Sequence, residues 1–264
     1  MSVAALLLGD SRFPAGGHAH SGGVEPAVTA GTVTGLQTLE WFLRGRLRTA
    51  GLVAAGLAAA ACAGVQRNAA PGESAALVRD HGFWSELDAE ADARTPAPAQ
   101  RESSRRQGRA LLRAARVVWP DAAGLASLAA AAGTRGARAA NEAGAGGGET
   151  RGGASRQEYR GGPHHAVVLG AAAAASGCEP LEAARIAAYQ AVAGPVSAAV
   201  RLLALDPMRA TGILAGLAGD IDQIAARGAD YAAGPLGDLP CASAPALDLL
   251  AETHIRAEVR LFES

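Results

Sequence analysis

The sequence predicts an all-α protein, a single helical domain of about eight to ten helices over residues 1–264. Apolar residues recur at helical spacing through most of the chain, and a proline or a capping residue precedes several of these stretches. Alternating apolar and polar runs of strand length are scarce. A chain of this length can bury roughly 70–75% of its unfolded surface, so it needs no disulfide or metal for stability.

Three long helices are expected in the first half of the chain. The first begins near Thr34 and continues through the Ala-rich residues 49–66. Pro71, with an acidic residue two positions later, starts the second helix, which reaches Leu87. The third covers about residues 101–118 and ends where a Trp-Pro pair follows.

The second half contains a predicted loop followed by further helices. Asp121 caps a short helix, and residues 133–162 are expected to form a flexible, dispensable loop. That segment is crowded with glycine and almost free of large apolar side chains, so it cannot bury enough surface to offset its ordering entropy. Helices are predicted again after His164, from Pro180, from Asp206-Pro207, and over residues 243–262.

The composition excludes several chemistries. All 24 basic residues are arginine, whereas a Walker-type phosphate loop or a Schiff base needs lysine. The three cysteines form no C-x-x-C pair, which argues against a disulfide framework or a zinc site and fits a reducing cytoplasm. A net charge of -1 and an aromatic content of 4% give no general attraction to nucleic acid. We therefore expect no cofactor and no bound metal.

A cytoplasmic location without a membrane partner is also expected. Residues 1–8 lack a basic start, and their apolar run stops at Asp10, so no export signal is visible. Residues 49–66 are uncharged and long enough to raise the question of a membrane span. They are mostly Ala and Gly, which contribute little apolar area, so we predict a buried helix.

Residues 13–25 form the most unusual segment. Pro14 fixes φ, and two pairs of glycines permit positive φ. Ser21 is expected at the N-cap of a helix whose first turn places Glu25 near the positive end of the dipole. Two interpretations stay open, namely a structural turn that leads into a helix and a shaped loop that contacts a partner.

Catalysis is not expected. The chain has no phosphate-cradling glycine pattern, no G-x-S-x-G elbow and no H-E-x-x-H pair. His20 and Ser21 are adjacent, but neighbours in sequence rarely point at each other productively, and no orienting acid is marked out. An enzyme built around His20 and Glu25 is kept as a third hypothesis.

Arginines recur every four residues in the predicted helix at 101–118. Arg101, Arg105, Arg109 and Arg113 therefore share one face. A solvated face is the leading interpretation, and docking of an acidic partner is the second. A helical regulator that binds nucleic acid through this stripe is the alternative function. Acidic residues just upstream can neutralise the stripe internally; they are Glu86, Asp88, Glu90 and Asp92.

The six histidines do not predict a stable nickel site. Imidazole suits Ni(II), but His18 and His20 lie two residues apart in a loop, and His164 and His165 are adjacent. Neither spacing is the i, i+4 of a helix-borne pair. A transient contact between these histidines and a nickel ion in transit remains an open hypothesis.

Several blocks of sequence, in order along nearly the whole chain, together resemble the UreF family of urease accessory proteins. Residues 133–162 are excepted. The blocks are LLLGDSRFPAGG (6–17), AHSGGVE (19–25), RESS with RQGR and LL (101–112), HHAVVLG (164–170), VSAAVRL (196–202), His254 with Arg256, and RLFES (260–264). The chain departs from the family at His18, at Asp206-Pro207 and at Glu263, where an aromatic, a Gly-Gln pair and a basic residue are usual.

This resemblance implies a helical scaffold without catalysis of its own. Such a protein binds the accessory protein UreD (also called UreH), recruits or modulates the GTPase UreG, and through the complex helps to insert nickel into apo-urease. A homodimer stays open. The partner-binding residues carried over from the resemblance are Phe13, Pro14, Gly16, Gly17, His20, Ser21, Gly22, Glu25, Arg105, Arg109, His254, Arg260, Phe262 and Ser264.

The C-terminal residues 260–264 are expected to contact a partner. They place an aromatic ring beside a guanidinium at a chain end, where disorder is the default and where both side chains make good interface anchors. Deleting them is expected to leave the melting temperature nearly unchanged. The alternative is that Phe262 folds back and fills the core.

Overall fold

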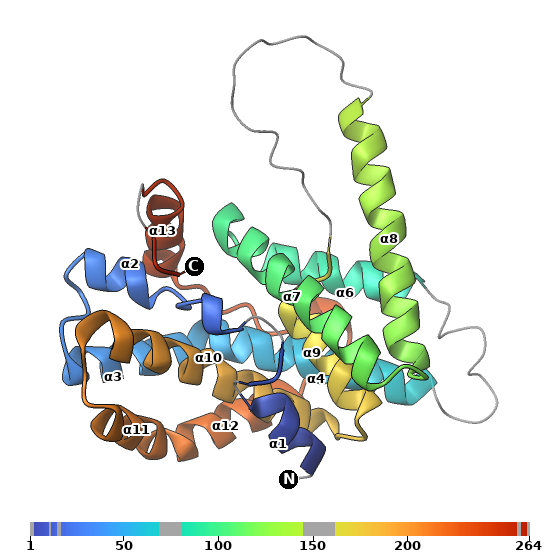
Figure 1. Cartoon of the computed structure of the whole chain (residues 1–264). Coiled ribbons are helices and arrows are strands. Elements are labelled where there is room, and N and C mark those ends of the chain that lie inside the picture. Colours follow the sequence, from blue (N-terminus) through green and yellow to red (C-terminus); the bar gives the residue numbers. More distant parts are fainter. Residues whose placement is uncertain are drawn as a thin grey trace.

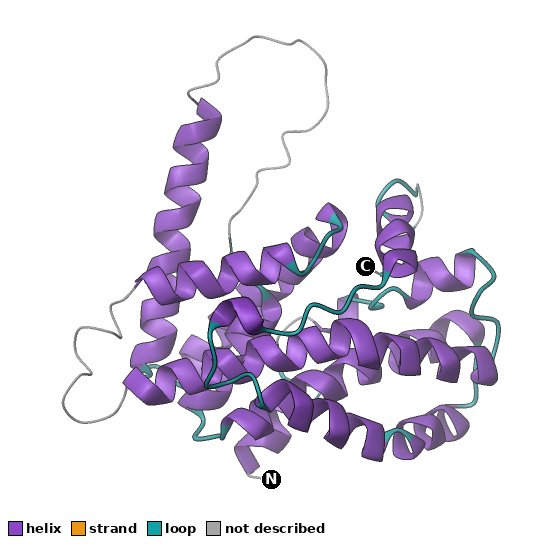
Figure 2. Cartoon of the chain, turned by 180° about the vertical axis from the view of Figure 1, so that it is seen from behind, coloured by secondary structure: helices purple, strands orange, loops and turns teal. Residues whose placement is uncertain are grey.

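A computed structural model of the chain describes residues 3–10, 12–14, 17–68, 81–144, 162–257 and 260–262. All regular secondary structure in these residues is helical, and no strand occurs among them (Figure 2). Eleven helices are present there when the continuous helix from Leu36 to Asn68 is counted once, so the all-α prediction is confirmed with one helix more than expected.

Four helices form the centre of the fold. The Ala-rich α4 (Leu52–Asn68) packs against α9 (His165–Ala175), α10 (Pro180–Leu203) and α12 (Ala218–Ala229). Small side chains let these helices approach closely. Gly170 of α9 faces the carbonyl of Ala58 in α4, and a Cβ at that glycine would lie only 2.2 Å from the carbonyl oxygen.

The remaining helices lie on two sides of this centre (Figure 1). On one side α6, α7 and α8 share a hydrophobic cluster with α4 and α9, and on the other α2, α3 and α11 share a second cluster with α4, α10 and α12. Their bounds are α1 Val3–Gly9, α2 Val24–Thr29, α3 Leu36–Arg46, α6 His81–Ala93, α7 Pro98–Val118, α8 Ala123–Gly144, α11 Pro207–Gly216 and α13 Pro245–His254. A π-helical turn, Leu47–Gly51, joins α3 to α4, and 3-10 turns cover Gly17–Ala19 and Leu236–Asp238.

Two helices are long and apolar enough to cross a membrane by length and composition alone. These are Leu36–Arg67 and Pro180–Leu203. In the most apolar 18-residue stretch of each helix, 72% and 44% respectively is buried inside the fold. Both belong to the centre of the helical bundle. The prediction that residues 49–66 form a buried helix is therefore confirmed.

Three predicted boundaries need correction. Helix α8 continues to Gly144, so the first part of the predicted loop 133–162 is helical; alanines and arginines there offset the glycines. Residues 145–161 lie outside the described part of the chain. Helix α7 begins at Pro98 and not near residue 101, because proline suits the first turn of a helix. The last helix ends at His254 and not at Phe262.

Candidate functional site

The N-terminal segment and the C-terminal tail meet at Glu25, in the first turn of α2. Its two carboxylate oxygens accept hydrogen bonds from the backbone N–H groups of Leu261 (2.7 Å) and Phe262 (2.9 Å). Figure 1 shows α13 and the C-terminus beside α2. Residues more than 230 positions apart in sequence thus form one contact.

Two further side chains hold Phe262 in place. The Nε2 atom of His254 lies 3.2 Å from the carbonyl oxygen of Phe262 and 3.3 Å from Oε2 of Glu25. The guanidinium carbon of Arg201 stands 4.3 Å from the centroid of the Phe262 ring, a cation–π geometry. The ring is buried at 6% exposure, so the prediction that Phe262 is an exposed anchor is wrong, and the core-filling alternative holds.

Replacing Glu25 with glutamine is expected to lower the free energy of unfolding by roughly 1–3 kcal/mol. A neutral amide keeps one acceptor oxygen, so one of the two tail N–H groups faces an NH₂ group instead. Urea unfolding measures the change, and Glu86→Gln, at an exposed acidic position of α6, is the matched control. Equal unfolding midpoints for the two variants would contradict the role of this carboxylate. Because the tail bonds to Glu25 and buries Phe262, deletion of residues 260–264 is expected to destabilise the fold, contrary to the expectation from the sequence.

The glycine-rich N-terminal segment forms the expected shaped turn, with a different cap. Gly22 and Gly23 adopt φ values of 58° and 88°, which favour glycine. Gly23, not Ser21, is the N-cap of α2, and Ser21 is fully buried. Phe13 is also buried, stacked on Trp119 at 6.1 Å between ring centroids.

His20 connects this segment to α7. Its Nδ1 lies 2.8 Å from the hydroxyl oxygen of Ser103. Because Glu25 binds the tail while His20 contacts α7, the two side chains serve separate contacts. The geometry does not support the hypothesis of an enzyme built around this pair.

Arg105 lies inside the fold and not on the predicted arginine surface. Its side chain is 5% exposed, and its guanidinium donates to Asp88 (2.9 Å), Asp92 (2.6 Å) and the carbonyl of Gly162. The prediction that upstream acids neutralise the stripe is confirmed for these two aspartates. The network ties α6 and α7 to the chain segment that enters α9.

A chain of hydrogen bonds extends this network into α9. The backbone N–H of His165 donates to the hydroxyl of Ser104 (3.2 Å), which lies 3.0 Å from Nδ1 of His164. Nε2 of His164 lies 2.8 Å from Oδ1 of Asp92. Burial alone would raise the pKa of Asp92, but the hydrogen bond from His164 and the charge of Arg105 outweigh it and lower that pKa to about 2.

Acid is expected to weaken the fold through Asp92. Because its pKa is lowered from 3.8 to about 2 on folding, its stabilising contribution is complete above pH ~4 and is lost as the pH falls towards 2. Urea unfolding across this pH range measures the slope. The Asp92→Asn variant should be less stable at neutral pH and should show a shallower loss in acid. Parallel pH profiles for the two proteins would contradict the assignment.

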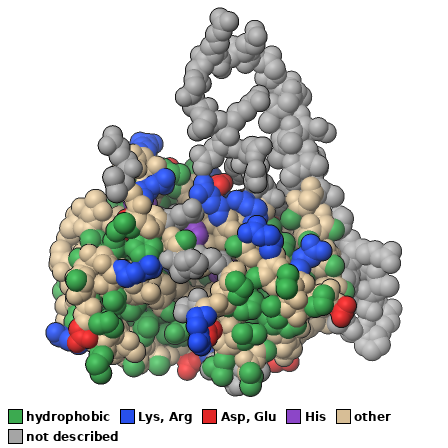
Figure 3. Space-filling view, in the orientation of Figure 1, with side chains coloured by type: hydrophobic (Ala, Val, Ile, Leu, Met, Phe, Trp, Pro, Cys, Tyr) green, Lys and Arg blue, Asp and Glu red, His purple; other side chains and the backbone are tan. Residues whose placement is uncertain are grey.

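The rest of the arginine stripe divides between internal and exposed roles. Arg101 donates to the carbonyl oxygens of Thr95 and Pro96, and Arg109 is half-buried beside Gly162. Arg113 is exposed, and Figure 3 shows basic side chains gathered near the centre of this face. Since Arg101 and Arg105 are used internally, no continuous cationic stripe faces a nucleic acid.

The other predicted partner-binding residues divide by exposure. Pro14, Gly17 and Arg260 are exposed, and Leu261 beside Arg260 is 73% exposed. Gly16 and Ser264 lie outside the described residues. Among the residues that the structure describes, no three His, Cys, Asp or Glu side chains lie together as a metal site would need.

Sequence reasoning missed two arginines. Arg201 contacts the tail, and Arg46 lies in a cavity against α10. The sequence did contain a signal for this contact. Pro195 lies inside a predicted helix and has no N–H, so the carbonyl of Ala191 needs another donor, which Arg46 provides. No comparable signal marked Arg201, whose contact depends on the folded tail.

Comparison with known proteins extends over the whole chain. A family model described as UreF matches residues 33–218. A protein of Mycobacterium sp. (strain JLS) named urease accessory protein UreF is 41% identical over 259 residues, covering 98% of this chain and 97% of that protein. Proteins of the same name from Mycolicibacterium vanbaalenii (41% over 261 residues, 98% and 97% covered) and Mycobacterium tuberculosis strain H37Rv (42% over 264 residues, 100% and 99% covered) are similar throughout.

Proposed function

The chain belongs to the UreF family of urease accessory proteins, and from that premise we propose that it is a scaffold for nickel insertion into apo-urease. In this role it binds a UreD/UreH-type accessory protein and recruits or modulates a UreG-type GTPase. It meets urease through that complex and performs no catalysis itself. Nickel is the cargo of the assembly.

The similarity to UreF proteins at both ends of the chain carries this proposal. Relatives match over 98–100% of its length, including the N-terminal segment and the tail. The fold joins these ends at Glu25, so four of the residues that the resemblance assigns to partner binding share one region: Glu25, His254, Arg260 and Phe262. Three free cysteines support a cytoplasmic location.

The exposed part of the tail is the surface that we assign to the UreD/UreH-type partner. Phe262 faces inward, whereas Leu261 is 73% exposed and Arg260 is exposed beside it. Leu249 on α13 is 71% exposed. An exposed leucine next to an arginine can bury apolar area and pair charge in one contact.

Replacing Leu261 with serine is expected to weaken the complex at least about tenfold, because burying a leucine side chain contributes about 1.5–3 kcal/mol. Its melting temperature should stay within a degree or two of wild type, since this side chain is exposed. A pull-down with the UreD/UreH-type partner, followed by UreG, measures binding beside a thermal melt. Met208→Ser, at an 84% exposed position of α11, is the control and should bind normally. Wild-type binding by Leu261→Ser would exclude the tail as the contact surface.

A further inference from the structure

Arg46 supports a defect in helix α10. Pro195 lies inside α10 and has no N–H to donate to the carbonyl of Ala191, four residues earlier. The Nε of Arg46 donates to that carbonyl at 2.9 Å. This bond fixes the plane of the guanidinium while using only one of its three nitrogens.

The backbone around Arg46 is also unusual. A π-helical turn, Leu47–Gly51, follows it directly, and such turns are frequent at functional sites. On the opposite side Gly22 allows the N-terminal segment to approach, because a Cβ there would lie 3.2 Å from Nη2 of Arg46 and 2.9 Å from the ring of Pro195. The guanidinium is therefore held from two sides.

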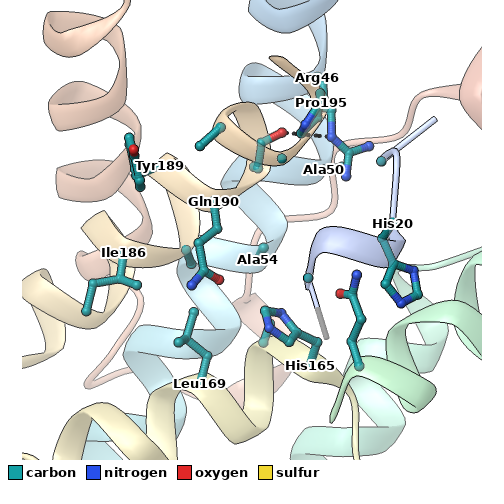
Figure 4. Close-up of a pocket in the computed structure, with 18 of the residues that line it drawn as sticks. His20, Arg46, Ala50, Ala54, His165, Leu169, Ile186, Tyr189, Gln190 and Pro195 are labelled. Atoms are coloured by element: carbon teal, nitrogen blue, oxygen red, sulfur yellow. Dashed lines mark hydrogen bonds between the residues drawn. The ribbon is translucent and has the colours of Figure 1, made fainter. Parts of the chain in front are cut away.

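The terminal nitrogens of Arg46 face a cavity of about 1530 Å³ (Figure 4). Within the described ranges, Nη1 and Nη2 have no acceptor and Arg46 forms no ion pair. Its neighbour Arg44, in contrast, pairs with Glu40 (2.9 Å) and with Asp220. Arg46 thus forms no ion pair within the described residues. Of the aspartates that line the same cavity, Asp10 pairs with Arg12 and Asp222 with Arg185, while burial raises the pKa of Asp248. Burial lowers the pKa of Arg46 to about 10, which leaves it charged at neutral pH.

The residues that Figure 4 labels between Arg46 and His165, namely Ala50, Ala54 and Gln190, carry no charge. Burial lowers the pKa of His165 to about 4, with a smaller contribution from nearby His20, so that imidazole is uncharged at neutral pH. Figure 4 shows Arg46 at one end and His165 at the other, with Gln190 pointing into the space between them. Apolar lining is provided by Ala50, Ala54, Leu169 and Ile186.

We propose that this cavity binds a carboxylate carried on an apolar body, with the two terminal nitrogens of Arg46 as its bidentate partner. A carboxylate matches the planar fork of a guanidinium and neutralises its charge, while an apolar body fills the space beside the Ala and Leu lining. A free organic acid and an acidic side chain of a partner protein share this chemistry. The proposal is independent of the role in urease maturation.

Thermal unfolding in the presence of hexanoate tests the site. Hexanoate is expected to raise the melting temperature in a saturable way, because a ligand that binds only the folded state stabilises it. Hexanamide, which has the same body without the charge, should have no effect. Two capped tripeptides, Leu-Glu-Leu and Leu-Gln-Leu, distinguish the sources: a Glu-dependent shift that exceeds that of hexanoate indicates a protein side chain, and the reverse indicates a free acid.

Variants separate binding from folding. Arg46→Met alone orphans the carbonyl of Ala191, so it is tested together with Pro195→Ala, which restores the helical N–H. Pro195→Ala alone should keep the hexanoate response, and the double variant should bind roughly 10- to 100-fold more weakly. Arg48→Gln, at an exposed position of the same π-helical turn, is the charge control and should respond like wild type. Three results would overturn the proposal. The double variant could respond to hexanoate as the wild type does, or the wild type could respond equally to hexanamide. The wild type could also respond to neither hexanoate nor the acidic tripeptide.

Discussion

Replacing Gly170 with alanine is expected to lower the free energy of unfolding by about 3 kcal/mol or more. The new Cβ would lie 2.2 Å from the carbonyl oxygen of Ala58 and 2.6 Å from the Cβ of Ala61. The first of these is backbone in a central helix, which cannot rotate away as a long side chain can. Helices α4 and α9 must therefore separate along the contact that forms the centre of the fold.

Urea unfolding of Gly170→Ala measures this cost, and Gly212→Ala in α11 is the control. A Cβ at Gly212 meets nothing within 4 Å, so alanine there should stabilise the protein by roughly 0.5–1 kcal/mol through its higher helix propensity. If Gly→Ala lowers the free energy of unfolding at Gly170 and raises it at Gly212, the result supports the helix packing described above. A stability change at Gly170 as small as that at Gly212 would show that α4 and α9 do not approach so closely.

Replacing Arg105 with methionine is expected to cost about 3–5 kcal/mol, because it removes the buried guanidinium that pairs with Asp88 and Asp92. Asp88 is 3% exposed, so water cannot replace the guanidinium. The carbonyl of Gly162 loses a donor in the same variant. The loss exceeds that of an ordinary surface ion pair, which contributes about 0–1 kcal/mol.

The matched control is Arg113→Met, two helical turns further along α7 at an exposed position. Its unfolding midpoint should stay close to wild type. If the two variants were equally stable, Arg105 would be a surface residue, as the sequence pattern suggested. A large loss confined to Arg105 would identify the network with Asp88 and Asp92 as a structural feature of α6 and α7.

Local sequence signals predicted the helices well. Pro180 and Asp206-Pro207 mark helix starts that the structure confirms, and the side chain of Asp206 caps α11 through the N–H of Met208. The glycine pairs predicted a turn with positive φ, which Gly22 and Gly23 provide. These features depend on a few adjacent residues, so the sequence contains nearly all the information that they need.

Contacts between distant segments could not be predicted in the same way. Phe262 looks exposed in sequence because chain ends are usually disordered, and only the folded chain places Glu25 and His254 against it. The helical period correctly aligned Arg105 with Arg109, but it could not show that α6 and Gly162 cover that face. Arg46 was missed because its bonding partner lies 145 residues away.

Nickel loading of apo-urease tests the central claim most directly. Apo-urease is produced together with its cognate UreD/UreH-type and UreG-type proteins, with or without this chain, and the nickel bound per urease and the rate of urea hydrolysis are measured. We predict that both rise strongly only when the chain is present, and that the folded variant Leu261→Ser gives a reduced rise. Equal nickel content and activity with and without the folded chain would contradict its assignment as the accessory scaffold.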